Sequence, residues 1–339
     1  MWESFIETVT KVNDWVNGVV WGWPMIVMIL GTGILLTVRT KVLQVRKFGE
    51  SLSSTIVPVV KGLGKKQGKR DKNSISQFEA FSAAISGTVG TGNIIGVTSA
   101  ILTGGPGAVM WMWISAFVGM VTNYSENVLG LYYRRKEKDG SSSGGAFYYI
   151  AYGLKQNWLG LFAAVFCLLA ATGMSGVQTN KITGSFISVL NTDETWVKLL
   201  IGSVVALFAA VVIIGGIKRI GRIASMLVPF MSVLFIIMSF IIIGKNIGAV
   251  PETFRLIFSS AFSAKAVAGG VGGFVFSQII KKGLARGVFS NEAGLGSSVI
   301  AHSASETREP VKQGLWGIFE VFFDTFVICT LTALVVLTT

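Results

Sequence analysis

The sequence contains few charged residues, one histidine and two cysteines. Asp, Glu, Lys and Arg make up 14% of the 339 residues, whereas 51% are hydrophobic. Soluble domains carry about 25% charged residues, so this composition indicates a protein whose solvent is the lipid bilayer. His302 stands alone, which excludes a histidine-based metal or catalytic cluster. Cys167 and Cys329 lie inside apolar segments, so we expect no disulfide and no redox role.

Long hydrophobic runs occur along the whole chain. Between Ala80 and Ser125 there is no Asp, Glu, Lys or Arg, which leaves room for two spans of about 20 residues. The runs predict an all-α integral membrane protein of about eight transmembrane helices. The predicted spans are 20–38, 79–101, 108–132, 158–190, 197–217, 223–244, 262–287 and 315–337.

The positive charges lie in the loops between these spans. The net charge is +12, and ten Lys or Arg lie between Arg39 and Lys72, which places this loop in the cytoplasm. The N-terminus and the turn at Gly104–Gly107 are then external. Because the basic residues form no continuous face, we expect no nucleic-acid partner. Lys181 lies within the fourth span, where we interpret it as reaching toward the outer interface.

The second span contains an unusual run of small and polar residues, from Ser86 to Asn93. Its three glycines each cost about 1 kcal/mol in a helix interior, so the run favours an unwound turn over an intact helix. Carbonyl groups freed in such a turn suit a small cation, and the N-terminus of the following half-helix suits a carboxylate. The alternative is close helix packing, because Gly92 and Gly96 form a GxxxG spacing.

The seventh span contains a second glycine-rich run, Gly269–Gly273. The second and seventh spans cross the membrane in opposite directions, as the corresponding segments of an inverted repeat do. We therefore divide the chain into an interfacial segment with the first span (1–38), a basic cytoplasmic loop (39–77), a first five-helix repeat (78–246) and an incomplete second repeat (247–339). Such a repeat would continue for three more helices, so we expect a truncated or partial carrier.

Two carboxylates lie in the eighth span. Asp324 is near the middle of the membrane, where a charge costs about 3 kcal/mol, so we expect it to neutralise a cation near Asn93 or to bind a neighbouring helix. Glu320 lies on the same helical face and suits a structural role. In the third span, Asn123, Glu126 and Asn127 share a face and suit hydrogen bonds between helices.

Three motifs resemble those of the alanine/glycine:cation symporter family, also called sodium:alanine symporters. They are Gly90-Thr-Gly-Asn-Ile-Ile-Gly-Val97, Gly104-Gly-Pro-Gly-Ala108 with Trp111-Met-Trp113, and Arg286-Gly-Val-Phe-Ser-Asn-Glu-Ala-Gly294. The resemblance extends over essentially the whole chain. It implies a LeuT-like fold in a bacterial cell membrane, and symport of alanine or glycine with sodium by alternating access.

The resemblance also implies roles for individual residues. The substrate would be bound by Thr88, Thr91 and Gly92, in a pocket closed by Gln178, Gly272, Gly273, Phe274 and Phe276. Sodium would face Ser86, Val89, Asn93 and Asp324. The charges of the Arg286–Gly294 motif and its position after the seventh span favour a cytoplasmic gate helix.

Other functions are weaker interpretations of the same residues. A channel would need a repeated filter or a charged ring, and an enzyme would need a nucleophile with a base. The sequence shows neither pattern. It leaves open alanine, glycine or a D-amino acid as substrate, sodium or proton as coupling ion, the sodium stoichiometry and the oligomeric state.

Overall fold

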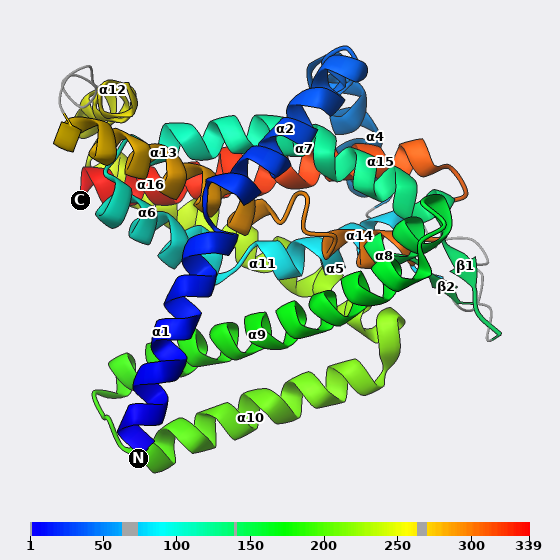
Figure 1. The fold of residues 1–339 in the computed structure, drawn as a ribbon, viewed down its shortest axis with the longest axis horizontal. Coiled ribbons are helices and arrows are strands. Elements are labelled where there is room, and N and C mark those ends of the chain that lie inside the picture. Colours follow the sequence, from blue (N-terminus) through cyan, green and yellow to red (C-terminus); the bar gives the residue numbers. More distant parts are fainter. Residues whose placement is uncertain (1, 63–73, 139–140, 263–269) are drawn as a thin grey trace.

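The computed structural model describes residues 2–62, 74–138, 141–262 and 270–339. The described chain is almost entirely helical (Figure 1). Its first helices are α1 (Trp2–Val20), α2 (Trp23–Arg39), α3 (Leu43–Arg46), α4 (Phe48–Gly62), α5 (Gln77–Thr88), η1 (Gly92–Gly96), α6 (Val97–Gly104) and α7 (Ala108–Tyr132). A two-stranded antiparallel ribbon follows, formed by β1 (Arg135–Lys136) and β2 (Ser142–Ser143).

The helices after the ribbon include the longest ones. They are α8 (Ala146–Tyr148), η2 (Tyr149–Gly153), α9 (Asn157–Leu190), α10 (Thr195–Ile214), α11 (Gly216–Lys245), η3 (Ile247–Ala249), α12 (Val250–Ala261), α13 (Gly270–Asn291), α14 (Ser298–Ser303), α15 (Pro310–Val321), η5 (Phe322–Cys329) and α16 (Thr330–Thr338). The last three follow one another directly and form a single span.

Several helices are long and apolar enough to cross a membrane. Among the described residues there are five, and the bent pair of α5 with η1 and α6 gives a sixth. The chain is therefore a multi-pass membrane protein. The two remaining predicted spans correspond to α7 and α13, which are helices with more polar sequences. Polar side chains are tolerated there because both helices pack in the interior, where protein groups replace water as partners.

Helix α7 lies at the centre of the packing, against α13, α15, α2 and α14. Glycines allow these helices to approach closely. A Cβ atom at Gly287 of α13 would lie 1.9 Å from Oγ of Ser115, and one at Gly317 of α15 would lie 2.6 Å from Nδ2 of Asn127. Because α7, α13 and α15 approach so closely, their polar side chains face one another in the core, where the site described below lies.

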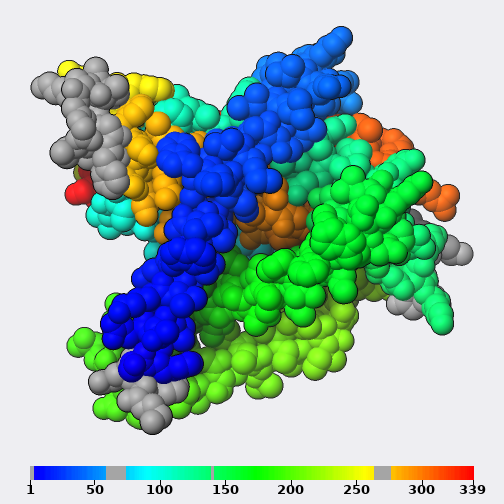
Figure 2. All heavy atoms as spheres, viewed as in Figure 1, coloured from blue at the N-terminus to red at the C-terminus, as the bar shows by residue number. Residues whose placement is uncertain are grey.

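Helices α9 and α10 extend away from this core as an antiparallel pair (Figure 1). Within them, only Gly160 and Val197 are buried. The space-filling view shows α1 also standing out from the body of the molecule (Figure 2). Their exposed residues are mostly apolar, which is typical of surfaces that face lipid.

Two segments predicted as loops contain helices. In the basic loop 39–77, α4 packs against α15, and Oγ of Ser51 donates a hydrogen bond to the carbonyl of Leu315 at 2.7 Å. Helix α12 lies between predicted spans and packs against α7. Both are too short for a span, so hydropathy alone did not reveal them. The strongly basic part of the loop, from Lys65 to Arg70, lies outside the described residues.

Candidate functional site

The second predicted span is broken, as its glycine-rich run predicts. Helix α5 ends at Thr88, Val89 is extended (ψ 97°), and the chain turns by 47° before η1 and α6. The break is narrower than the predicted Gly87–Asn93 segment, because Gly87 still belongs to α5. Asn93 stabilises the turn: its Oδ1 accepts a hydrogen bond from the amide of Gly90 at 2.8 Å. The first residues after the break form a π-helical turn, a distortion that recurs at functional sites.

A buried polar cluster lies behind this turn. Nδ2 of Asn93 donates to Oδ1 of Asp324 at 2.6 Å and to Oγ of Ser290 at 3.1 Å. The hydroxyls of Ser290 and Thr325 both donate to Oδ2 of Asp324, at 2.8 and 3.0 Å. All four side chains are at most 1% exposed. The structure thus brings Asn93 and Asp324 into contact across 231 positions of sequence.

A pocket of about 500 Å³ opens on the other side of the break. Gln178 of α9 faces the break directly, since a Cβ atom at Gly90 would lie 3.1 Å from its Nε2. Lys181, one turn further along α9, also lines the pocket and is exposed. The lining residues are Val89, Gly90, Thr91, Asn93, Ile94, Ile95, Gln178, Lys181, Ile182, Ser185, Met231, Ser232, Phe235 and Ile328.

Other predicted site residues lie away from this pocket. Thr88 is buried and its hydroxyl donates to the carbonyl of Ile85, while that of Ser86 donates to Ala83. Gly92 faces Phe289 and Ser290 of α13, with 3.8 Å between their atoms and a Cβ built at Gly92.

The predicted residues of the seventh span are also distant from the break at Gly90. Gly272, Gly273, Phe274 and Phe276 occupy the first turns of α13. Phe276 precedes Ser290 by 14 residues, or about 21 Å along the helix axis. The structure therefore does not bring the start of α13 to the polar cluster.

The second break was predicted in the wrong place. Gly270–Asn291 is one continuous helix, and Gly269 lies outside the described residues. The chain leaves the helix at Glu292 and begins α14 at Ser298, with positive φ angles at Glu292, Gly294 and Gly296. Glycines weaken a helix by about 1 kcal/mol each without being sufficient to break it, whereas Asn and Ser also offer side-chain hydrogen bonds that favour turns.

The Arg286–Gly294 motif therefore lies at this second break, not in a cytoplasmic helix after the span. Its Ser290 belongs to the Asp324 cluster, and Nδ2 of Asn291 donates to Oγ1 of Thr325 at 3.2 Å. Sequence reasoning missed both residues. The available signal was the Ser-Asn pair at the end of an otherwise apolar helix.

The second break is closed by protein groups. Oε2 of Glu126, a buried residue of α7, accepts a hydrogen bond from the amide of Gly294 at 3.0 Å. The Ser297 hydroxyl donates to the Glu292 carboxylate, and the amide of Ala293 donates to Oδ1 of Asn291. The predicted helix-to-helix role of Glu126 is thus a contact between α7 and the break.

A further buried cluster supports α14 from α15. Nε2 of His302 lies 2.8 Å from Oε2 of Glu320, and Nδ1 lies 2.6 Å from Nε2 of Gln313. All three side chains are 0% exposed. The predicted structural role of Glu320 agrees with this arrangement.

Arg134 holds the end of α14 to the end of α7. Its guanidinium donates to the carbonyls of Ser303, Ser305 and Thr307 at 2.6–3.2 Å. Burial lowers the pKa of Arg134 from its usual range, and nearby Arg308 lowers it further. The three carbonyl groups supply the hydrogen bonds that this partly buried cation requires.

Comparison with known proteins identifies the family of the chain. Residues 6–339 match the model of the sodium:alanine symporter family. The sodium/alanine symporter AgcS of Methanococcus maripaludis is 41% identical over 97% of this chain and 70% of its own length. A putative sodium/proton-dependent alanine carrier protein of Bacillus subtilis, YrbD, is 40% identical over 95% of this chain and 63% of its own length.

A third relative has a different named substrate. The probable sodium/glutamine symporter GlnT of Bacillus subtilis is 39% identical over 95% of this chain and 64% of its own length. Members of this group are transporters rather than enzymes, in agreement with the sequence analysis. With a family match over almost its whole length, the chain belongs to the sodium:alanine symporter family.

Proposed function

We propose that this protein carries small neutral amino acids, alanine or glycine, into the cell together with sodium. One observation carries the proposal: the break at Val89–Gly90 opens onto a pocket of about 500 Å³, and the residue that closes the turn, Asn93, also binds a buried carboxylate. Relatives named for sodium with alanine or glutamine support neutral amino acids as the substrate class.

The substrate binds at the break and against α9. The first amides of η1 point toward the break, where the partial positive charge of a helix N-terminus favours a carboxylate. Thr91 lines this position, and Gln178 provides hydrogen-bonding groups opposite Gly90. Lys181 adds a positive charge at the same pocket, so it favours the carboxylate rather than the ammonium end.

Sodium binds next to the substrate, at the Asp324 cluster. Asp324, Ser290 and Thr325 offer carboxylate and hydroxyl oxygens, which are the ligands that hard cations take. Carbonyl groups at the end of α5, near Ser86 and Val89, add acceptors that no longer belong to a helix. The ion takes the place of the Asn93 amide at Oδ1 of Asp324, and this exchange couples ion binding to the shape of the turn.

The two breaks fit a LeuT-like inverted repeat in the cytoplasmic membrane. Residues 78–246 form the first repeat and residues 247–339 belong to the second, with the breaks at Val89–Gly90 and Glu292–Ser297 as corresponding points. Alternating access then follows from rocking of the repeats around the pocket. Support comes from the Asp324 cluster, which Asn93 joins from the first break and Ser290 from the helix end before the second.

Uptake by the purified protein in liposomes tests the proposal. Labelled alanine should accumulate when a sodium gradient is imposed and not when a proton gradient is imposed alone. Asp324→Asn keeps the size of the side chain but removes its charge, so we expect uptake to fall about a hundredfold, or about 2.7 kcal/mol. Equal uptake with and without sodium would refute sodium coupling.

Thr325→Val is a matched variant for the same cluster. It removes one hydrogen-bond donor to Asp324 and retains the carboxylate. We expect a several-fold higher sodium concentration for half-maximal uptake, with the maximal rate retained. An unchanged sodium dependence in both variants would place the ion elsewhere.

A further inference from the structure

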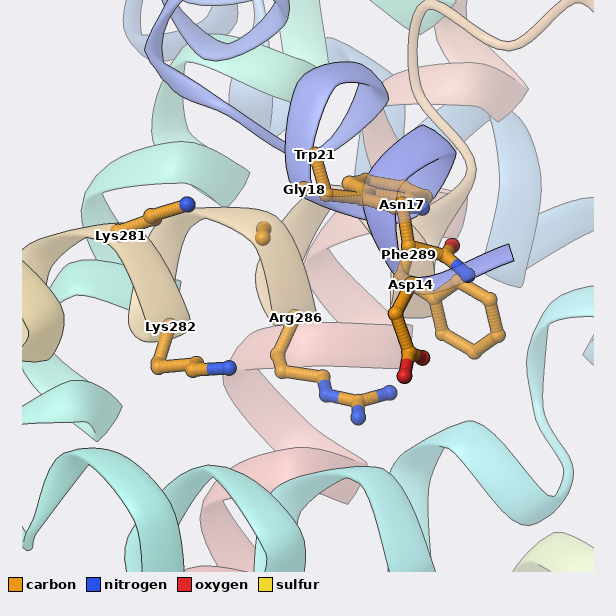
Figure 3. Close-up of a pocket in the computed structure, with 9 residues that line it drawn as sticks. Asp14, Asn17, Gly18, Trp21, Lys281, Lys282, Arg286 and Phe289 are labelled. Atoms are coloured by element: carbon orange, nitrogen blue, oxygen red, sulfur yellow. The ribbon is translucent and has the colours of Figure 1, made fainter. Parts of the chain in front are cut away.

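A second cavity, of about 490 Å³, lies between α1 and α13 (Figure 3). Asp14, Asn17, Gly18 and Trp21 line it from α1. The opposite wall is formed by residues of α13, namely Lys281, Lys282, Ala285, Arg286 and Phe289. None of the residues assigned to substrate or sodium above lines this cavity.

The cavity combines three positive charges with one negative charge. The charged ends of Lys282, Arg286 and Asp14 are turned toward the same space, whereas Lys281, which also lines the cavity, points away from them in this view (Figure 3). Asp14 and Lys282 are exposed and Arg286 is half-buried, so a solute can reach these charges from the surface. A ligand that pairs with all of these charges must carry both an anionic and a cationic group.

The cavity is adjacent to the first break. Phe289 lines the cavity and also lies 3.8 Å from the position of a Cβ atom at Gly92. The residue that follows it, Ser290, contacts Asn93 and Asp324. Trp21 packs edge-on against Phe289, with 6.0 Å between ring centroids. The two aromatic rings therefore separate the cavity from the candidate site.

The α13 wall of the cavity lies beside the turn predicted to be external, although the sequence predicts the Arg286 motif to be cytoplasmic. A Cβ atom at Gly104 would lie 3.1 Å from Cβ of Lys282, and Gly104 begins the turn predicted to be external. The opposite end of the core contains Arg134 with Ser303 and Ser305, in agreement with a cytoplasmic side. An external solute therefore meets the charged cavity before it reaches the break.

We propose that this charged cavity is an entry site that holds a zwitterionic amino acid before it passes Phe289. Lys282 and Arg286 bind its carboxylate, Lys281 adds positive charge to the same wall, and Asp14 binds its ammonium group. The inference rests on the proposed function for the identity of the solute. A phospholipid headgroup with phosphate and ammonium has the same pair of charges, but the adjacent break favours the amino acid.

Kinetics of alanine uptake test the entry site. In the double variant K281Q/K282Q we expect the KM for alanine to rise about tenfold at low ionic strength with kcat retained, because the cations act on association. High salt should reduce this difference, since it screens exposed charges. D14N should raise KM by about threefold through loss of the ammonium partner.

The control is K11Q/K198Q, which removes the same net charge from two exposed ion pairs outside the cavity. It should keep the KM of the parent protein. A KM for K281Q/K282Q equal to that of the control would overturn the entry site. The same KM measurement in liposomes with and without phosphatidylethanolamine distinguishes the amino acid from a lipid headgroup. A rise in KM seen only with phosphatidylethanolamine would show that the cavity binds a headgroup and would overturn the entry site.

Equilibrium binding of labelled alanine separates this inference from the proposed function. In sodium-free buffer, the parent protein should retain weak alanine binding that K281Q/K282Q loses. If the parent protein shows no sodium-driven uptake but retains this binding, the proposed function fails and the entry site stands. If uptake is normal and sodium-free binding is equal in both proteins, only the entry site fails.

Discussion

Two described spans are broken near the Asp324 cluster, and the free backbone groups of the two breaks have different partners. At Val89–Gly90 one backbone amide is bound by Asn93, and the remaining groups border a pocket. At Glu292–Ser297 the amides of Gly294 and Ala293 are bound by Glu126 and Asn291, and that of Leu295 by the carbonyl of Glu292. The first break thus faces a space that a ligand can occupy, whereas the second is held by the protein itself.

The difference shows that a break in a membrane helix is not by itself evidence of a binding site. Backbone groups freed inside a membrane must be satisfied by protein, water or ligand. The partners present at each break decide which of these applies. We therefore expect variants at the second break to lower the stability of the protein, and variants at the first break to lower uptake.

Glu126→Ala should give the largest effect on stability. It removes the buried acceptor for the amide of Gly294, which costs about 2 kcal/mol. We expect a lower Tm in detergent, with the KM for alanine retained by the protein that remains folded. Glu126→Gln keeps an acceptor oxygen and serves as the control. A parent-like Tm for Glu126→Ala would show that the second break does not depend on α7.

The position of the first break could be predicted from sequence because its cause is local. Three glycines with Thr91 and Asn93 lie in one run, and the structure bends there. The proximity of Asp324 and Asn93 was a hypothesis based on the cost of a charge in the membrane, and the two side chains are in contact. Neither result required knowledge of the packing between distant helices.

The second break could not be located in this way because its partner is distant. Glu126 precedes Gly294 by 168 positions, and only folding brings the two together. The run at Gly269–Gly273 is richer in glycine than Glu292–Ser297, yet residues 270–273 are helical. Gln178 was expected from the family resemblance, while its contact with Gly90 depends on how α9 packs.

Gly90→Ala should give an intermediate effect, on uptake rather than stability. The new methyl group would lie 3.1 Å from Nε2 of Gln178, which displaces that side chain from the pocket. We expect about a tenfold loss of kcat/KM for alanine, or about 1.4 kcal/mol, with Tm nearly unchanged. Gly87→Ala is the control, because a Cβ atom there meets nothing within 4 Å. Equal uptake by both variants would contradict the role of Gly90 and Gln178.

Gly294→Ala should give the smallest effect, again on stability. Gly294 has φ +90°, a conformation that costs a side-chain-bearing residue about 1 kcal/mol, while its nearest neighbour from Ile29 would be 3.5 Å from the new Cβ. Strain rather than a clash therefore lowers Tm, by a few degrees at most. Gly244→Ala in α11 has open space around it and no positive φ, so it should not lower Tm. If Gly294→Ala also lowered sodium-driven uptake per folded molecule, the second break would take part in transport directly and the contrast between the two breaks would no longer hold.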